Sequence, residues 1–499
     1  MRLRHSISWF VMLCLAATVC SAGTPSPADL GALAREAFAS GATPGMSIAI
    51  VQGDTTLFVS GYGYASVEEK IPVTPETAFY LASTGKAFTA LEVQLLAAKG
   101  EFSLDDPLSK LLPGAALDSA LDPNKISLRD LLTHTHGISG RGPVTFRCAF
   151  TGEGTGEELA GLLRFHPPAK EGRSFSYSNL GYDVAGLIID RKVKGGWRAG
   201  IERDVLTPLG MRRSGPRVSR VSPKDMAQPY ERGAVGFERI RYGKRDENMN
   251  ASGGELSTAA DLARFVRVHL NGGWLEGRSI IPERVILESR RKQAQQTRQF
   301  GEMTRYGWGL GWDLAMYEGD TLVSRFGDFP GFRSHVSYMP SRGIGVVVLV
   351  NGGGASAPLA DIVALSLYDR LLERADVVDR LRNRLAGHGT DMQKAAEGIR
   401  LDRERRAGRD QRLPHALSAY AGDYVNPQFG RMRWTTNGDR LEVTMGAAGC
   451  TAEVFDASTN KMRVELTGGG SIVEFEIPPG GARATALKFL DAQFTRSGS

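Results

Sequence analysis

The chain has 499 residues, of which 42% are apolar and 23% are charged, with a formal net charge of +6 at pH 7. This length predicts two domains, and the apolar content excludes a disordered or fibrous chain. Without Arg2 and Arg4 the charge is +4, which is weak for this size, and the basic residues of 400–412 alternate with acidic ones. The sequence therefore predicts no nucleic-acid partner.

Residues 1–22 have the features of a signal peptide. Arg2 and Arg4 precede a short apolar run, Ile7–Val19, and Cys20-Ser21-Ala22 supplies small residues for cleavage. The run is too short and too poorly flanked to span a membrane stably. We expect an exported protein, periplasmic or secreted, with no stable membrane span after cleavage.

The cysteines and histidines indicate neither a metal site nor a disulfide framework. After cleavage only Cys148 and Cys450 remain, far apart in the sequence, so two unpaired buried thiols are expected although a disulfide is chemically open to them. His134 and His136 have no neighbours at zinc-ligand spacing. No cofactor is predicted.

Residues 23–375 follow the pattern of one α+β domain. A helix is expected over 28–40, strands over 46–51 and 55–64, and an amphipathic helix over 84–99. Further strands are expected from Tyr306 to Val350, before a closing helix over 358–374. Strands at both ends with helices between them predict an antiparallel sheet that joins the two ends, with a helical subdomain beside it.

The last part of the chain differs from residues 23–375 in composition and in hydrophobic pattern. Residues 376–412 form a charged, helix-prone connector. Residues 413–499 contain short alternating segments separated by turns such as Asn437-Gly438, which predict a small antiparallel β domain. No catalytic constellation is found in it.

The first candidate catalytic element is Ser83-Thr84-Gly85-Lys86, at the start of the helix expected over 84–99. Residues i and i+3 share one helix face, so the Lys86 amine can reach the Ser83 hydroxyl. A serine needs an adjacent base, and a lysine serves when burial or its neighbours lower its pKa. The same spacing recurs in Ser289–Lys292 and Ser458–Lys461, in a charged stretch and a polar turn. The tetrapeptide alone therefore decides nothing.

The second element is Tyr177-Ser178-Asn179, which precedes an apolar helix over 184–189. A phenol beside a lysine ammonium is stabilised as phenolate and can move protons, and Asn179 can bind both Lys86 and a substrate amide. Tyr424-Val425-Asn426 repeats the pattern in an expected strand and turn.

Together the two elements resemble the serine β-lactamase and penicillin-binding-protein superfamily, most closely its class C β-lactamase-like branch. Supporting segments are Leu131–Gly137, Pro208–Met211, Ser252–Thr258 and Pro330–Phe332. The resemblance implies a β-lactamase/transpeptidase-like catalytic domain, with a lipocalin-like C-terminal β domain. It also implies Ser83 as nucleophile, Lys86 as its base partner and Tyr177 as the group that accepts and returns the proton.

The third family element departs from the usual pattern. Where the family has Lys or His, a small residue and Gly, this chain has Arg325-Phe326-Gly327. The resemblance implies close backbone approach at Gly327 and an oxyanion hole formed by the Asp328 and Ser83 N–H groups. Arg325 keeps a positive charge that can bind a carboxylate, or faces solvent as an ordinary strand residue. Phe326 is bulky and favours a less polar acyl substrate.

These residues predict a serine hydrolase that forms an acyl-enzyme on Ser83 and cleaves an ester or amide, as a carboxylesterase or D-amino-acid peptidase does. The substrate is a small molecule or peptide that supplies the acyl group. Two alternatives stay open, namely an acyltransferase with the same residues and a non-catalytic binding protein of the cell envelope. The sequence does not define the oligomeric state.

Overall fold

The computed structural model describes residues 25–241 and 243–498. Its larger sheet is antiparallel throughout, in the order β10-β11-β12-β13-β14-β15-β1-β2-β3. The strands are β1 Gly45–Gln52, β2 Thr55–Ser66, β3 Ile71–Pro72, β10 Ala294–Phe300, β11 Met303–Trp308, β12 Asp313–Tyr317, β13 Asp320–Phe329, β14 Phe332–Met339 and β15 Ile344–Val350. Strands from the two ends of this region meet where β1 pairs with β15, as predicted.

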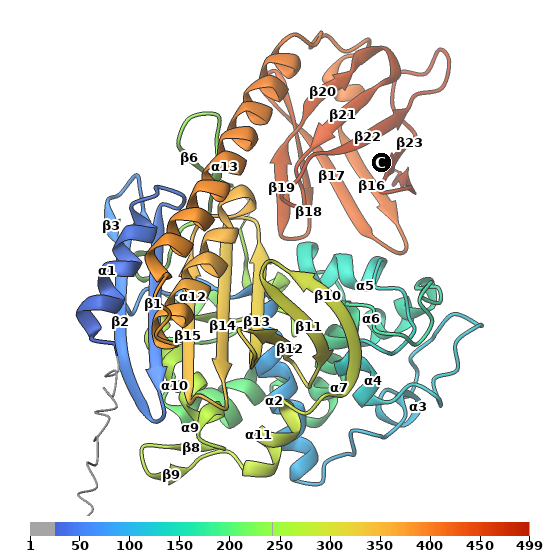
Figure 1. Ribbon diagram of the computed structural model, residues 1–499. Helices are drawn as coiled ribbons and strands as arrows, with labels where there is room; N and C mark the ends of the chain where they lie inside the picture. The colour runs from blue at the N-terminus through green and yellow to red at the C-terminus, as the bar shows by residue number, and fades with distance from the viewer. Residues whose placement is uncertain (1–24, 242, 499) are drawn as a thin grey trace, which may run out of the picture.

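Helices cover both faces of this sheet (Figure 1). On one face lie α1 (Pro27–Phe38) and α12 (Pro358–Leu371), with a core of Leu30, Ile48 and Val348 among others. On the other face lie α10 (Ala259–Leu270) and α2 (Gly85–Ala98). The apolar cores on the two faces fix the positions of these helices, including α2, relative to the sheet.

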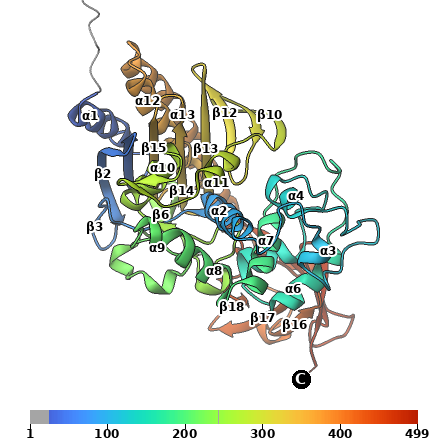
Figure 2. The same ribbon diagram turned by 90° about the horizontal axis from the view of Figure 1, so that it is seen from below.

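The remaining helices gather beside the sheet (Figure 2). They are α3 Leu108–Leu111, α4 Leu128–Thr133, α5 Pro143–Phe146, α6 Gly156–Leu162, α7 Leu180–Lys192, α8 Gly196–Gly200, α9 Thr207–Leu209 and α11 Glu283–Ser289. Along the chain, most of these helices follow β4 (Phe79–Tyr80) and precede β7 (Leu256–Ser257). Strands β4 and β7 pair with each other. This pairing brings the Ser83 segment to the boundary between the helices and the sheet.

The C-terminal region is all β after a single long helix. Helix α13 runs from Val377 to Ala407 and leads into a nine-stranded antiparallel sheet. Its strands are β16 Gly422–Asn426, β17 Gly430–Asn437, β18 Arg440–Met445, β19 Ala448–Thr451, β20 Glu453–Asp456, β21 Lys461–Val464, β22 Ser471–Glu476, β23 Ala486–Phe489 and β24 Ala492–Arg496. The mixed α and β class and the all-β C-terminal part are therefore confirmed.

The second run of strands in this sheet begins earlier in the chain than the sequence predicted. Strands β10 and β11 precede and extend across Tyr306, the residue at which strands were expected to begin. The expectation was wrong because β10 is an edge strand of mostly polar residues, and it lacks the apolar alternation that marks a half-buried strand.

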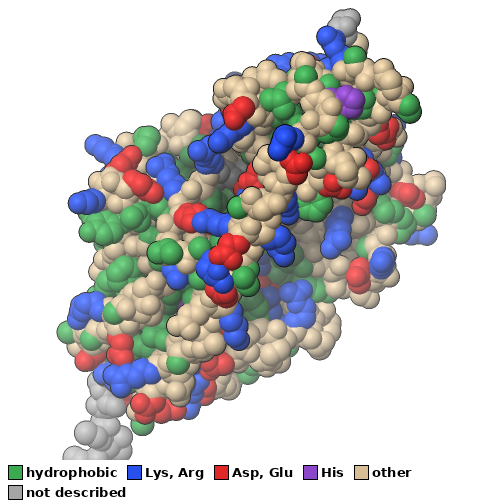
Figure 3. All heavy atoms as spheres, turned by 90° about the horizontal axis from the view of Figure 1, so that it is seen from above, with side chains coloured by type: hydrophobic (Ala, Val, Ile, Leu, Met, Phe, Trp, Pro, Cys, Tyr) green, Lys and Arg blue, Asp and Glu red, His purple; other side chains and the backbone are tan. Residues whose placement is uncertain are grey.

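Charges of both signs are interspersed over the upper face of the described residues (Figure 3). Basic and acidic residues of α13 pair with each other and with the rest of the molecule, as in Arg400–Glu404, Arg403–Glu238 and Arg406–Asp402. Among the described residues, no helix is both long and apolar enough to cross a membrane. The segment predicted as a signal peptide lies outside the described residues.

Candidate active site

Ser83 lies in a tight turn, the 3-10 segment Ala82–Thr84, which leads directly into α2. Ala82 adopts a positive φ of 48°, a conformation that costs a residue with a side chain free energy. Gly85 is required because an added Cβ would lie 1.7 Å from a carboxylate oxygen of Glu255. Gly253 also packs closely, since an added Cβ would lie 2.8 Å from the Ala82 carbonyl oxygen. The surrounding segments thus hold the serine in one position.

Lys86 is completely buried, with 0% of its surface exposed. Its Nζ lies 3.2 Å from Ser83 Oγ, 2.6 Å from Asn179 Oδ1 and 2.6 Å from the carbonyl of Ser252. Burial lowers the pKa of Lys86, while the nearby Tyr177 hydroxyl opposes that shift. Because all three contacts are to oxygens of uncharged groups, the amine is held against Ser83 without a formal ion pair.

Tyr177 lies on the other side of the Ser83 hydroxyl. Its hydroxyl is 2.9 Å from Ser83 Oγ, and Arg325 donates a hydrogen bond to it at 2.7 Å. Burial by itself would raise the pKa of Tyr177, but the positive charges of Arg325 and Lys86 outweigh it and lower the pKa to about 8. The residue is 39% exposed, so a molecule in the cleft can reach the ring.

The Arg325 side chain faces the site and not solvent. It is 3% exposed, and its guanidinium contacts the Ser83 carbonyl through Nε at 2.9 Å and Asp313 Oδ2 through Nη1 at 2.9 Å. The sequence analysis expected Arg325 to bind a carboxylate or to face solvent. The carboxylate that it binds is that of Asp313, within the protein. Through its third interaction, with the Tyr177 hydroxyl, the guanidinium links strands β12 and β13 to the Tyr177 segment.

Asp313 is a site residue that the sequence analysis missed. It begins β12, is 2% exposed, and also accepts a hydrogen bond from Gln296 at 3.0 Å. The signal was present as a single acidic residue inside the apolar stretch 308–315. A lone buried acid requires a cationic or donor partner, and here Arg325 is that partner.

Gly327 and Asp328 bring the β13 backbone to the serine. A Cβ on Gly327 would lie 1.8 Å from the Leu81 carbonyl, so only glycine permits this approach. Phe329 pairs with Phe332 across a two-residue turn, which makes that pair the hydrogen-bonded one. The Asp328 N–H therefore points away from β14, toward the strand edge that β12 leaves uncovered. Its side chain lies 3.6 Å from Arg333.

Phe326 does not line the cleft, contrary to its predicted effect on substrate polarity. It is 6% exposed, and its ring packs 4.9 Å from Phe300 and 4.7 Å from His335, measured between ring centroids. Strand alternation explains the difference, because Arg325 and Gly327 face α2 while Phe326 faces the opposite core. The inference of a less polar acyl group loses its basis.

His134 supports the tyrosine segment from behind. Its ring lies 4.6 Å from that of Tyr177 and 4.5 Å from that of Trp308, and its Nδ1 accepts the Ser178 N–H at 3.2 Å. Burial lowers the pKa of His134 well below its usual value. These contacts indicate a packing and positioning role for His134.

The remaining motif matches lie away from this site. Ser289 donates to the Ile286 carbonyl at the end of α11, and Ser458 donates to Asp456 in the β domain. Tyr424 is buried in β16, where its hydroxyl donates to the Tyr420 carbonyl. Cys148 and Cys450 are both free.

Comparison with known proteins places the catalytic region in a family. The model of the beta-lactamase family matches residues 30–368, more than half of the chain. "Protein flp" of Staphylococcus aureus strain N315 is 27% identical over 321 residues, which are 62% of this chain and 60% of that protein. The match thus spans less than two thirds of that relative's length.

Solved structures agree in fold. A penicillin-binding protein homologue from Pyrococcus abyssi has a TM-score of 0.59 at 24% identity, over 94% of this chain and 99% of that one. The D-amino acid amidase from Ochrobactrum anthropi SV3, complexed with L-phenylalanine amide, has a TM-score of 0.57 at 22% identity, over 71% and 98%. This chain belongs to the β-lactamase/penicillin-binding-protein superfamily.

Proposed function

We propose that this chain is a serine hydrolase that cleaves an ester or amide through an acyl-enzyme on Ser83. The observation that carries the proposal is the contact of one hydroxyl with two basic groups. Ser83 Oγ lies 3.2 Å from the Lys86 amine and 2.9 Å from the Tyr177 hydroxyl. An alcohol becomes a nucleophile at neutral pH only when such a neighbour takes its proton.

Acylation begins when Ser83 Oγ attacks the substrate carbonyl carbon and its proton passes to the Tyr177 phenolate, with Lys86 stabilising the negative charge. The carbonyl oxygen becomes an oxyanion, which the N–H groups of Ser83 and Asp328 stabilise. Tyr177 then returns the proton to the departing oxygen or nitrogen as that bond breaks. Water then attacks the acyl carbonyl carbon while Tyr177 takes a proton from it. The bond to Ser83 Oγ breaks, Tyr177 returns the proton to that oxygen, and the acid is released.

Arg325 takes the place of the Lys or His of the family pattern in this scheme. As a guanidinium it supplies charge but no proton. Its hydrogen bond to the Tyr177 hydroxyl favours the phenolate, and its bond to the Ser83 carbonyl fixes the nucleophile turn. We propose that Asn179, which accepts a hydrogen bond from Lys86, binds a polar atom of the acyl group.

The substrate class follows from the same geometry and from one similarity. Nothing in the Ser83 environment distinguishes an ester from an amide, and the fold is shared with a D-amino acid amidase. We therefore propose carboxylesters and D-amino-acid amides or peptides as substrates. We also propose that residues 1–22 direct export, on the pattern of Arg2, Arg4 and the apolar run that follows.

The test is hydrolysis of a panel of p-nitrophenyl esters, D-amino-acid amides and β-lactams by the wild type and by Ser83→Ala. We expect at least one ester or amide to be turned over, and the activity to vanish in the variant. A wild type that is inert to every substrate, or a variant that keeps its activity, would overturn the proposal. Added amines or alcohols that divert product from the free acid would identify an acyltransferase.

A further inference from the structure

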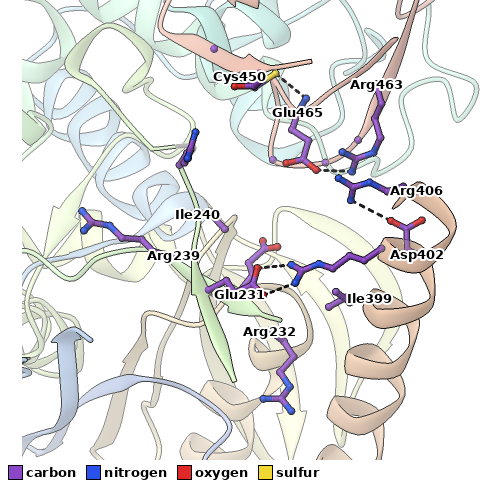
Figure 4. Close-up of a pocket in the computed structure, with 18 of the residues that line it drawn as sticks. Glu231, Arg232, Arg239, Ile240, Ile399, Asp402, Arg406, Cys450, Arg463 and Glu465 are labelled. Atoms are coloured by element: carbon purple, nitrogen blue, oxygen red, sulfur yellow. Dashed lines mark hydrogen bonds and ion pairs between the residues drawn. The ribbon is translucent and has the colours of Figure 1, made fainter. Parts of the chain in front are cut away.

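Two neighbouring cavities share Arg239, Ile240 and Arg241 and differ in the charges of their other lining residues. One, of about 870 Å³, lies between α13, the hairpin of β5 (Tyr230–Arg232) and β6 (Phe237–Arg239), and the C-terminal sheet (Figure 4). Several of its cations pair with acids, for example Arg463 with Glu465 at 2.6 Å and Arg406 with Asp402 at 3.5 Å. Acidic residues thus offset most of the positive charge in the lining of this cavity.

The second cavity, of about 530 Å³, lies at the turn between β13 and β14. Its apolar lining includes Tyr80, Phe329 and Phe332, and its polar lining includes Lys244, Arg239 and Arg241. Among the described residues that line it, none is acidic. Among the ion pairs of the described residues within 4.0 Å, none includes Lys244, Arg239 or Arg241, although the charge of Asp183 acts on Lys244. This cavity combines apolar walls with three cations and no acid in its described lining.

Lys244 is the innermost of these cations. Its Nζ donates to the carbonyls of Ala149 at 2.6 Å and Asn248 at 3.0 Å, and it lies 4.5 Å from the centre of the Phe329 ring. Two of its three donors are used in these contacts, and both acceptors are uncharged. The amine is thus fixed in position. Burial lowers the pKa of Lys244 to about 7, so a bound carboxylate would stabilise its ammonium form.

Arg239 and Arg241 lie at the mouth, where both are exposed. Arg239 donates to Gln228 Oε1 at 2.5 Å, which holds it without neutralising it. In Figure 4 the Arg239 side chain points away from the ion pairs of Arg406 and Arg463. Arg239 lines both cavities, so its charge is available at the mouth of either one.

The reaction geometry determines which half of a substrate meets this cavity. The leaving group must face Tyr177, which returns its proton, and Tyr177 is bonded to Arg325 at one end of the exposed β13 edge. The acyl group on the other side of the carbonyl therefore extends past Asp328 toward Phe329, the first cavity residue. Tyr80, only three residues before Ser83, packs against Phe329 with ring centroids 5.0 Å apart.

We propose that this cavity is an acyl-group subsite for a chain with an apolar body and a terminal carboxylate, bound by Lys244 with Arg239 and Arg241. The proposal rests on the function proposed for Ser83. Apolar carbons would contact Phe329 and Phe332, and the carboxylate would accept the free donor of Lys244. Charge-assisted hydrogen bonds of this kind are stronger than neutral ones, particularly away from bulk water.

The test compares mono-p-nitrophenyl esters of succinic, adipic and suberic acid with the p-nitrophenyl esters of butanoic, hexanoic and octanoic acid. We expect the wild type to prefer the carboxylate member of at least one pair by about 10-fold in kcat/KM. Lys244→Met and the double variant Arg239→Gln/Arg241→Gln should remove most of that preference and leave the neutral esters unchanged. Arg278→Gln, at an exposed position in β9 (Arg278–Ser279), is the matched control. Equal rates within every pair in the wild type would overturn the subsite.

A binding measurement separates this subsite from the proposed reaction. The same acyl groups, made as N-butyl amides, are titrated calorimetrically into Ser83→Ala, which cannot turn them over. Tighter binding of a carboxylate amide, weakened by Lys244→Met and by added salt, supports the subsite even if no ester is hydrolysed. Equal binding of charged and neutral amides contradicts it, while the Ser83→Ala hydrolysis test would remain unaffected.

Discussion

Two tetrapeptides of this chain carry nearly the same letters and have very different surroundings. Ser83-Thr84-Gly85-Lys86 begins α2, and Ser458-Thr459-Asn460-Lys461 lies between β20 and β21. Lys86 is fully buried and bonded to Ser83, whereas Ser458 is exposed and donates to Asp456. Lys461 lies 3.6 Å from Glu474 and is partly exposed.

The difference shows that burial and neighbours, and not spacing, give the first pair its chemistry. Lys461 lies beside water and the carboxylate of Glu474, and no contact holds it against Ser458. At Lys86, burial disfavours the charged amine, and Asn179 and the Ser252 carbonyl fix it in place without supplying a counter-charge. A base and a nucleophile are thereby held together at 3.2 Å.

Replacing each lysine in turn tests the difference between the two tetrapeptides and has the largest expected effect. Lys86→Met should lower kcat/KM for ester hydrolysis by about 10³-fold, because the serine loses a proton-handling partner. Lys461→Met should leave kcat/KM within a factor of two. Steady-state kinetics, with circular dichroism to verify folding, measure both. Similar losses in the two variants, or full activity in Lys86→Met, would contradict the distinction.

A smaller effect is expected from Arg325. Catalysis by the Tyr177 phenolate requires loss of its proton, so kcat/KM should rise with pH through the pKa of about 8 and fall below it. Arg325→Met removes a positive charge 2.7 Å from the hydroxyl, so the rise should shift upward by about one pH unit. At pH 7 the rate should drop about 10-fold.

The pH profile separates this positioning effect from structural damage. Arg325→Lys should return the rise toward the wild-type pH, because it restores the charge. Asp313→Asn removes a negative charge and leaves that of Arg325 in place, so it should not move the rise to higher pH as Arg325→Met does. A profile that keeps its midpoint in Arg325→Met would rule out charge on Arg325 as the cause.

The smallest effect concerns stability and a second buried group on α2. Glu92 is 0% exposed, and its burial, aided by the nearby charge of Asp204, raises its pKa to about 7. A raised pKa contributes stability that is fully present below the unfolded pKa of about 4.5 and is lost as pH rises through about 7. Glu92→Gln should therefore stabilise the fold by about 2–3 kcal/mol at pH 8 and by little at pH 5.

Denaturant unfolding of the wild type and the variant at pH 5 and pH 8 measures this difference. Glu474→Gln, whose carboxylate is about half exposed beside Lys461, is the control and should change the free energy of unfolding by less than about 0.5 kcal/mol at either pH. Equal changes for Glu92→Gln at both pH values would show that Glu92 is not buried as a titrating acid.

The sequence predicts the local elements of this fold well, and its long-range contacts poorly. Helix α2 and strand β1 follow apolar periodicity within a residue or two, whereas β10 was missed because polar edge strands carry little pattern. Ser83, Lys86, Tyr177 and Asn179 were selected by their order and flanking segments. The partnership of Asp313 and Arg325 was not visible, since β12 and β13 must first pair before their side chains meet.

The most direct measurement is to locate the acyl group on the protein. Wild type is quenched with acid during turnover of a p-nitrophenyl ester, digested with trypsin and analysed by mass spectrometry. We predict the acyl mass on the peptide Ile71–Lys86, in which Ser83 is the only serine, and none on the peptide that contains Ser458. Hydrolysis with no adduct on Ser83, or an adduct that persists in Ser83→Ala, would contradict the central claim.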